Sequence, residues 1–264
     1  MAVALESILK RDRAIVVTGL AAISFVAWAY MVREARAMYN TGICSCVGMQ
    51  MSGPDTTQWQ VTTLLPLFLM WAEMMVAMML PSAAPMILTF ATVNRKRREQ
   101  DRPFVPTAIF LLGYIFIWTV FSAIATFAQW TLHGQALLSP MMVSNSRWLG
   151  GTLLLAAGLF QWIPLKHSCL AHCRSPLNFL LAEWREGKLG ALWMGLKHGA
   201  YCTGCCWFLM ALLFVAGVMN LWWIAVISVL VLLEKVAPRG LLIGKAAGLA
   251  LALWGVCLMV QAAV

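Results

Sequence analysis

The stretch FVPTAIFLLGYIFIWTVFSAIATF (residues 104–127) contains no charged residue. A helix needs about 20 apolar residues to cross the hydrocarbon core of a bilayer, and this run is long enough. Its apolar residues are continuous instead of alternating with polar ones, which favours a helix over a strand of a membrane barrel. A helix also satisfies its backbone polar groups within one segment, as lipid requires. We therefore predict a transmembrane helix here.

The rest of the chain has the same character. Of its 264 residues, 62% are hydrophobic and only 11% are charged, whereas a soluble domain has about 25% charged residues. We predict an all-α, polytopic transmembrane helix bundle that forms a single domain over residues 1–264, with the lipid bilayer as its surroundings. The candidate spans are residues 14–32, 61–90, 104–127, 148–165, 191–218, 221–236 and 241–263.

Two of these seven candidate spans are irregular. The second contains Pro66, Pro81 and Pro85, and a proline removes a hydrogen bond inside a helix, so we expect this span to be bent or broken. The sixth, residues 221–236, is short for a crossing, and without it the count becomes six.

The distribution of basic residues predicts the orientation. If the N-terminus is cytoplasmic, all of the 19 Lys and Arg residues except Arg33, Arg36 and Arg147 lie on the cytoplasmic side. This is the bias that the positive-inside rule describes. It predicts a cytoplasmic N-terminus, an outer C-terminus and a bacterial inner (cytoplasmic) membrane location. The net charge of +9 is thereby explained without a nucleic-acid partner.

A carboxylate and several thioethers occur inside the second span, in the stretch WAEMMVAMMLPS (residues 71–82). A carboxyl group is costly in a membrane and usually handles an ion, a proton or a partner. At helical spacing one arc holds Glu73, Met70, Met74 and Met78, whereas Met75 and Met79 point to the opposite side. Thioethers are soft ligands for Cu(I). The alternative is that these methionines only fill an apolar core.

Thiols and imidazoles cluster on the predicted cytoplasmic side. One helical turn after the fourth span would place on one face Cys169, His172 and Cys173. The start of the next span would similarly place on one face His198, Cys202, Cys205 and Cys206. Both groups lie near the same interface, so they are predicted to converge on a metal, for which copper, zinc and iron–sulfur chemistry are the alternatives.

Other interpretations of the cysteines stay open. Cytoplasmic thiols are reduced, so ligation is favoured over disulfides. Cys202 and Cys205 form a C-x-x-C pair that suits redox chemistry, although the chain lacks the βαβ context of thioredoxins. A buried Cys is also a small hydrophobe, which is how we interpret the isolated Cys257. Glu234-Lys235, at the inner end of the sixth span, is predicted to be an interface anchor with the lysine reaching water. The alternative is that Glu234 reaches the metal site on the inner face.

A third group lies in the loop after the first span, on the predicted outer side. Cys44 and Cys46, with Met49 and Met51 nearby, form a flexible set of soft ligands. They suit the capture of Cu(I) from outside. In an oxidising compartment the same two cysteines would instead form a disulfide.

Four pieces of the sequence resemble a known family. They are WAEMMVAMMLPS (71–82), LKHSCLAHCRSP (165–176), YCTGCCWFLM (201–210) and EKVAP (234–238), in that order. The chain is similar in these pieces to the predicted metal-binding integral membrane proteins, a bacterial family catalogued as a domain of unknown function. The resemblance implies metal binding and supplies no substrate or reaction. The Cys44-x-Cys46 loop lies outside it.

These observations predict a metal-binding inner-membrane protein, with copper as the preferred ion, that holds, delivers or transports the metal. The alternative is an accessory or assembly subunit of a larger copper-dependent oxidase or oxygenase, with a structural metal site. A third hypothesis is an enzyme of thiol or metal redox chemistry. The expected partners are other subunits of such a complex or further copies of the chain. No phosphate-binding glycine loop is present, which excludes a P-loop ATP-driven pump.

Overall fold

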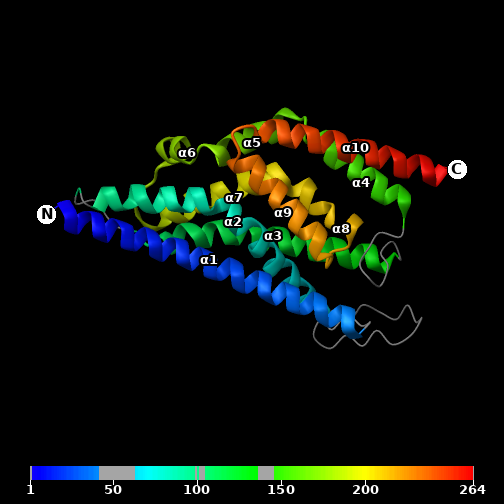
Figure 1. Cartoon of the computed structure of the whole chain (residues 1–264), viewed down its shortest axis with the longest axis horizontal. Helices are drawn as coiled ribbons and strands as arrows, with labels where there is room; N and C mark the ends of the chain where they lie inside the picture. The colour runs from blue at the N-terminus through cyan, green and yellow to red at the C-terminus, as the bar shows by residue number, and fades with distance from the viewer. Residues whose placement is uncertain (1, 42–62, 99, 101–104, 136–145, 264) are drawn as a thin grey trace.

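The structure, a computed structural model, describes the backbone of residues 2–41, 63–98, 100, 105–135 and 146–263. The regular secondary structure in these ranges is entirely helical, so the all-α prediction is confirmed for them. Figure 1 labels the helices in chain order. They are α1 (Ala2–Thr41), α2 (Leu64–Arg98), α3 (Thr107–Gly134), α4 (Arg147–Phe160), α5 (Pro164–Arg174), α6 (Pro176–Glu183), α7 (Gly187–Ala211), α8 (Leu213–Ala216), α9 (Leu221–Val236) and α10 (Gly240–Ala263).

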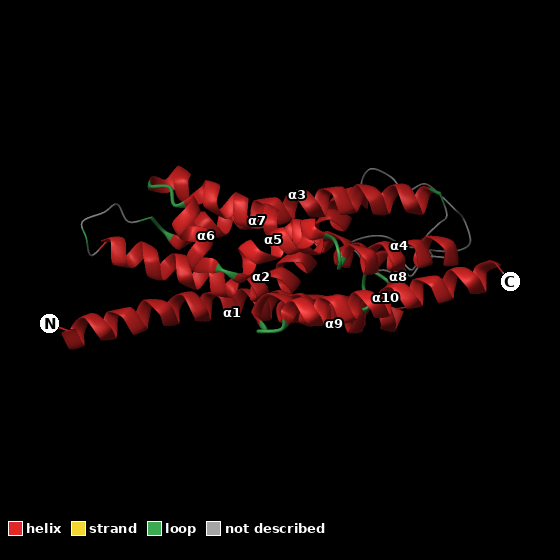
Figure 2. Cartoon of the chain, turned by 90° about the horizontal axis from the view of Figure 1, so that it is seen from above, coloured by secondary structure: helices red, strands yellow, loops and turns green. Residues whose placement is uncertain are grey.

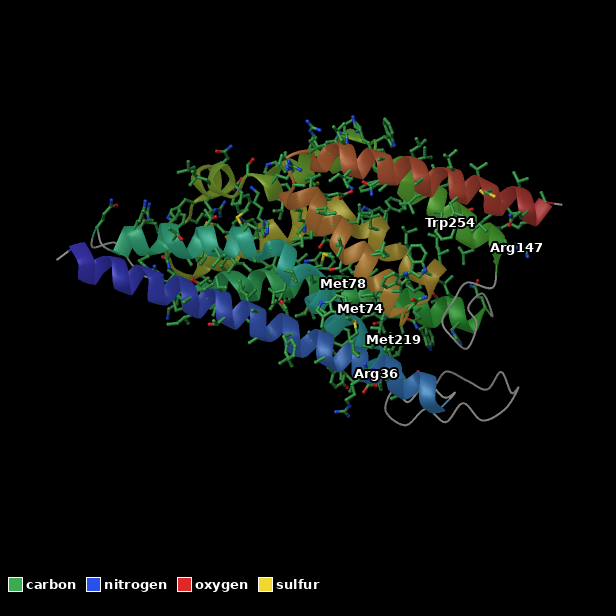
Figure 3. All side chains as sticks on the ribbon, viewed as in Figure 1. Arg36, Met74, Met78, Arg147, Met219 and Trp254 are labelled. Carbon is green, nitrogen blue, oxygen red and sulfur yellow. The ribbon has the colours of Figure 1, made fainter. Side chains whose placement is uncertain are left out.

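The helices form an elongated bundle. The chain runs back and forth along its length through α1, α2, α3, α4 with α5, α7 with α8, α9 and α10 (Figure 1). The two termini lie at opposite ends of the bundle in both views (Figures 1 and 2). The predicted outer-side residues Arg36 and Arg147 lie toward the C-terminal end (Figure 3).

Within the described part of the chain, five helical segments are long and apolar enough to cross a membrane, and they fall in α1, α2, α3, α7 with α8, and α10. A sixth would be the bent pair α4 and α5, if the two count as one span. Helix α9 has the boundaries predicted for the sixth span, but its 16 residues are fewer than a full crossing needs. By length, the described residues therefore contain five or six spans, where the sequence predicts seven, or six without residues 221–236.

The fourth predicted span is divided. Helix α4 ends at Phe160, and α5 leaves it at an angle of 63°. Pro164 is the first residue of α5, and Ile163 before it has φ −71° and ψ 136°. A proline pushes the preceding residue out of the helical region, which explains the break. The segment after it, interpreted from sequence as a loop with one helical turn, forms α5 and α6.

Helix α2 lies in the core. It stays helical through Pro81 and Pro85 and changes direction along its length in Figure 1, so of the two predicted outcomes, bent or broken, the helix is bent. Trp71 is completely buried and donates a hydrogen bond from Nε1 to Oε1 of Gln129 on α3, at 2.6 Å. On the side of α2 that faces α1, Nε1 of Trp28 donates a hydrogen bond to the Ala77 carbonyl at 3.1 Å. The helices that carry the site therefore pack against α2.

Glycines let the helices of the site approach closely. On α7, a Cβ added at Gly195 would overlap the Phe110 carbonyl of α3, and one added at Gly199 would lie 2.9 Å from the Ile117 side chain. On the other side of the bundle, a Cβ at Gly158 of α4 would lie 2.6 Å from the Gly248 carbonyl of α10. Small residues at helix contacts are typical of membrane bundles, because packing holds the helices together there.

Candidate metal centre

Helix α7 presents three thiols to the core. Cys202, Cys205 and Cys206 are each at most 1% exposed. The thiols of Cys205 and Cys206 both donate to the carbonyl oxygen of Cys202, at 3.0 Å and 2.9 Å. Their spacing of three and four residues puts them on one helical face, as the sequence predicts. That face is directed inward because α7 packs between α3 and α5.

Helix α5 brings a fourth thiol to this face. Cys173 is buried, and its side chain interacts with those of Cys202 and Cys205. Cys169, one turn earlier, is half-buried and packs against α7 at Gly204, where an added Cβ would lie 3.1 Å from its Sγ. The thiols of the two sequence motifs therefore meet in space, because the bend after α4 lays α5 across α7. We call Cys173, Cys202, Cys205 and Cys206 the thiol cluster.

The two predicted histidine ligands have different surroundings. His172 stacks on Tyr201, with ring centroids 4.1 Å apart, and its Nδ1 is 2.8 Å from the Ser168 carbonyl. His198 is 2% exposed and stacks on Tyr114, with centroids 5.5 Å apart. Its Nδ1 has no hydrogen-bond partner within the described residues. Of the two, only His198 is buried one helical turn before Cys202.

Lys235 points into the protein, so its interpretation as an interface anchor is wrong. The residue is 7% exposed. Its Nζ donates to Sγ of Cys202 and to Oγ of Ser82, both at 2.9 Å. The Tyr114 hydroxyl also lies 3.2 Å from the Cys202 sulfur. A polar site thus surrounds one thiol of the cluster, and sequence reasoning assigned neither Lys235 nor Tyr114 to it.

The neighbouring Glu234 is also buried, and it has its own partner. Both of its carboxylate oxygens accept from Nζ of Lys166 on α5, at 2.7 Å and 2.8 Å. Lys166 also donates to the Gln161 side chain. Arg174, near the end of α5, donates to the carbonyl oxygens of Glu234 and Ala237 at 2.6 Å and 2.8 Å. These contacts fasten α5 to the end of α9 and so hold Cys173 in place.

Met79 of α2 places a thioether beside the thiol cluster. Its Sδ lies 4.0 Å from Sγ of Cys206. The sequence placed Met79 on the side opposite to Glu73 and assigned it no role. Met74 and Met78 are fully buried in the middle of the bundle (Figure 3), and Met70 is partly buried.

Glu73 lies apart from the thiol cluster. It borders a pocket of about 450 Å³ whose other walls are on α1, among them Ala27 and Tyr30. It also borders a pocket of about 360 Å³ shared with Ile115 and Trp118 of α3. Neither pocket is lined by a methionine. An ion-handling site inside the membrane, formed by Glu73 with Met70, Met74 and Met78, stays a prediction.

The thiol cluster offers soft sulfur donors in a buried position. Within the described ranges, no three His, Cys, Asp or Glu side chains are arranged as a ready metal-binding group. Two thiolates are nevertheless sufficient for Cu(I), which prefers soft sulfur ligands and tolerates low coordination numbers. The described cysteines are all free. The outer-side candidates Cys44 and Cys46 lie outside the described residues.

Comparison with known proteins agrees with this chemistry. No curated protein and no solved structure matches the chain. Residues 68–258 match the family described as PpoB2, copper chaperone. The matched region contains α3 to α9 entirely, together with most of α2 and α10, and therefore the whole thiol cluster with Met79 and Lys235. Because this match covers well over half of the sequence, the chain belongs to the PpoB2 family of copper chaperones.

Proposed function

We propose that this protein is a membrane-embedded copper chaperone that binds Cu(I) as cargo at the thiol cluster. The observation that carries the proposal is the meeting of Cys173 from α5 with Cys202 and Cys205 from α7 in a buried position. Thiolates and thioethers select Cu(I) over harder ions. Met79, 4.0 Å from Cys206, extends the soft surface by one thioether.

A chaperone must release its cargo as well as bind it, and the position of Cys169 suits release. This half-buried thiol lies one turn from Cys173 and packs against Gly204 of α7. We propose that copper moves between the thiol cluster and Cys169 by exchange of one sulfur ligand for the next. Such exchange avoids a free ion in the apolar interior, where a lone charge is very costly.

We also propose that the protein spans a bacterial inner membrane seven times, with the N-terminus in the cytoplasm. Support comes from five apolar helices of spanning length, from the back-and-forth course of the chain and from the bias in basic residues. In this arrangement the bent pair α4 and α5 makes one shortened crossing, and α9 makes another. Both pack against the long helices. Reporter fusions at each terminus and in the segments between the helices test it, since the two ends should report opposite compartments and successive segments should alternate between them.

Copper content of the purified protein is the direct test of function. The full chain, purified without oxygen in detergent and incubated with Cu(I), should retain about one ion per chain after desalting. The double variant Cys202→Ser/Cys205→Ser, which removes both thiols that Cys173 meets, should lose it, and Cys257→Ser, on the exposed face of α10, should not. A wild-type protein without bound copper, or a double variant that keeps it, would contradict the proposal.

The alternative role as an accessory subunit gives a different result in cells. A chaperone that supplies copper should change total cell copper or the copper content of a client enzyme when it is deleted, and Cys205→Ser should reproduce the change. An accessory subunit should instead co-purify with its complex in mild detergent and leave total copper unchanged. The Cys205→Ser variant of such a subunit should still assemble.

A further inference from the structure

The ammonium group of Lys235 occupies a fixed position beside the thiol cluster. It lies 2.9 Å from the Cys202 sulfur and 2.9 Å from the Ser82 hydroxyl. The Ser82 hydroxyl in turn donates to the Met79 carbonyl at 2.9 Å, which holds the acceptor toward the lysine. The side chain begins in the last turn of α9 and is 7% exposed. A long, flexible cation is thus held inside the protein by defined contacts.

A buried charge requires compensation, since an unpaired ion in a low-dielectric interior is unfavourable. The neighbouring charges do not provide it, because Glu234 already binds Lys166 through both of its carboxylate oxygens. That pair is neutral by itself. Among the described residues, the group that accepts a hydrogen bond from Lys235 and can carry a negative charge is the Cys202 sulfur.

We infer that Lys235 is the counter-ion of an anionic copper centre at the thiol cluster. A Cu(I) ion held by two thiolates carries one net negative charge, and the ammonium of Lys235 makes the whole centre neutral. This inference rests on the proposed function and adds a residue that sets the charge of the site. Lys235 is not a ligand, because an ammonium group has no lone pair.

The same charge balance gives the site a preference among ions. A divalent ion such as Zn(II) on the same two thiolates is neutral, so with Lys235 the centre keeps an uncompensated positive charge. A monovalent soft ion on the same two thiolates leaves no uncompensated charge when Lys235 is included. The lysine therefore favours Cu(I) over Zn(II), in addition to the preference that sulfur ligands already have for soft ions. Removing the charge should weaken Cu(I) binding and should not weaken Zn(II) binding.

The test measures the affinity of the full chain in detergent for Cu(I) and for Zn(II), by competition with chelators of known affinity, without oxygen. Lys235→Met and Lys235→Gln are both neutral, one apolar and one polar. Each should weaken Cu(I) binding about tenfold or more, equivalent to about 1.4 kcal/mol, with Zn(II) binding unchanged or tighter. Ser82→Ala, which keeps the charge and removes a neighbouring contact, should stay close to wild type for both ions.

Thermal unfolding of the copper-free variants separates a charge role from a structural one. Unlike Lys166→Met, Lys235→Met leaves no carboxylate without its partner and replaces the ammonium by an apolar side chain of similar length, so the Tm of the copper-free variant should stay close to that of the wild type. Unchanged Cu(I) affinity in both neutral variants would overturn the inference while leaving the proposed function intact. Parallel loss of both metals together with a lower Tm would show a structural role and overturn it as well. Failure of the wild type to bind Cu(I) would remove the proposed function itself.

Discussion

The ammonium of Lys166 on α5 lies 2.7 Å and 2.8 Å from the two carboxylate oxygens of Glu234 on α9, and neither side chain is more than 2% exposed. This ion pair joins the helix that carries Cys173 to the helix that carries Lys235. Both sides of the thiol cluster therefore depend on a contact between two charged residues that are distant in sequence. A buried pair of this kind fixes geometry more than it adds stability, because desolvation offsets most of its attraction.

Breaking the pair on one side should be costly. Lys166→Met leaves the Glu234 carboxylate buried without its partner, and such changes cost about 3–5 kcal/mol. The double variant Lys166→Met/Glu234→Leu should be much less destabilised than the single one. The free energy of unfolding in mixed detergent measures this. Equal destabilisation by the single and double variants would show that the pair does not interact as the geometry indicates.

The distance between Met79 and Cys206 distinguishes one methionine from its equally buried neighbours. Met79→Leu should weaken Cu(I) binding severalfold, because it removes the thioether that lies 4.0 Å from the Cys206 thiol. Met75→Leu is the matched control, since Met75 is also 0% exposed. Both changes nearly conserve volume and should cost less than about 1.5 kcal/mol of stability. Competition titration with a Cu(I) chelator checks the result, and equal effects of the two variants would exclude a role for Met79.

The two cysteines of α5 should differ in what they control. Cys173→Ser should lower the affinity for Cu(I), because this thiol contacts Cys202 and Cys205 in the interior. Cys169→Ser should leave the affinity nearly unchanged and slow the transfer of copper to an external chelator. Stopped-flow transfer rates and equilibrium titrations together separate the two effects. An unchanged transfer rate in Cys169→Ser would exclude the exchange route through this thiol.

The contact between α3 and α7 should be sensitive to a single methyl group. Gly195→Ala places a Cβ against the Phe110 carbonyl, which is backbone and cannot move aside cheaply. Overpacking of this kind costs about 1–3 kcal/mol. Gly19→Ala on α1, where no atom lies within 4 Å of the added carbon, should be neutral or slightly stabilising. Thermal unfolding of the two variants compares them directly, and equal Tm values would contradict the close approach.

Much of the architecture could be predicted from sequence because it depends on local properties. Long uncharged runs form helices in an apolar environment whatever they pack against. The limits of α9 and α10 follow from such runs to within a residue. The bend after Phe160 was missed because apolar composition continues through it, while the backbone is interrupted by Pro164.

The same distinction between local pattern and tertiary contact applies to the site. The sequence by itself determined that Cys202, Cys205 and Cys206 share a face, because helical spacing alone requires it. Only the tertiary structure decided that Lys235 points inward to Cys202 and that Met79 lies beside Cys206. The direction of a long side chain at a helix end depends on which partners the neighbouring helices bring within reach, and no pattern along a single helix contains that information.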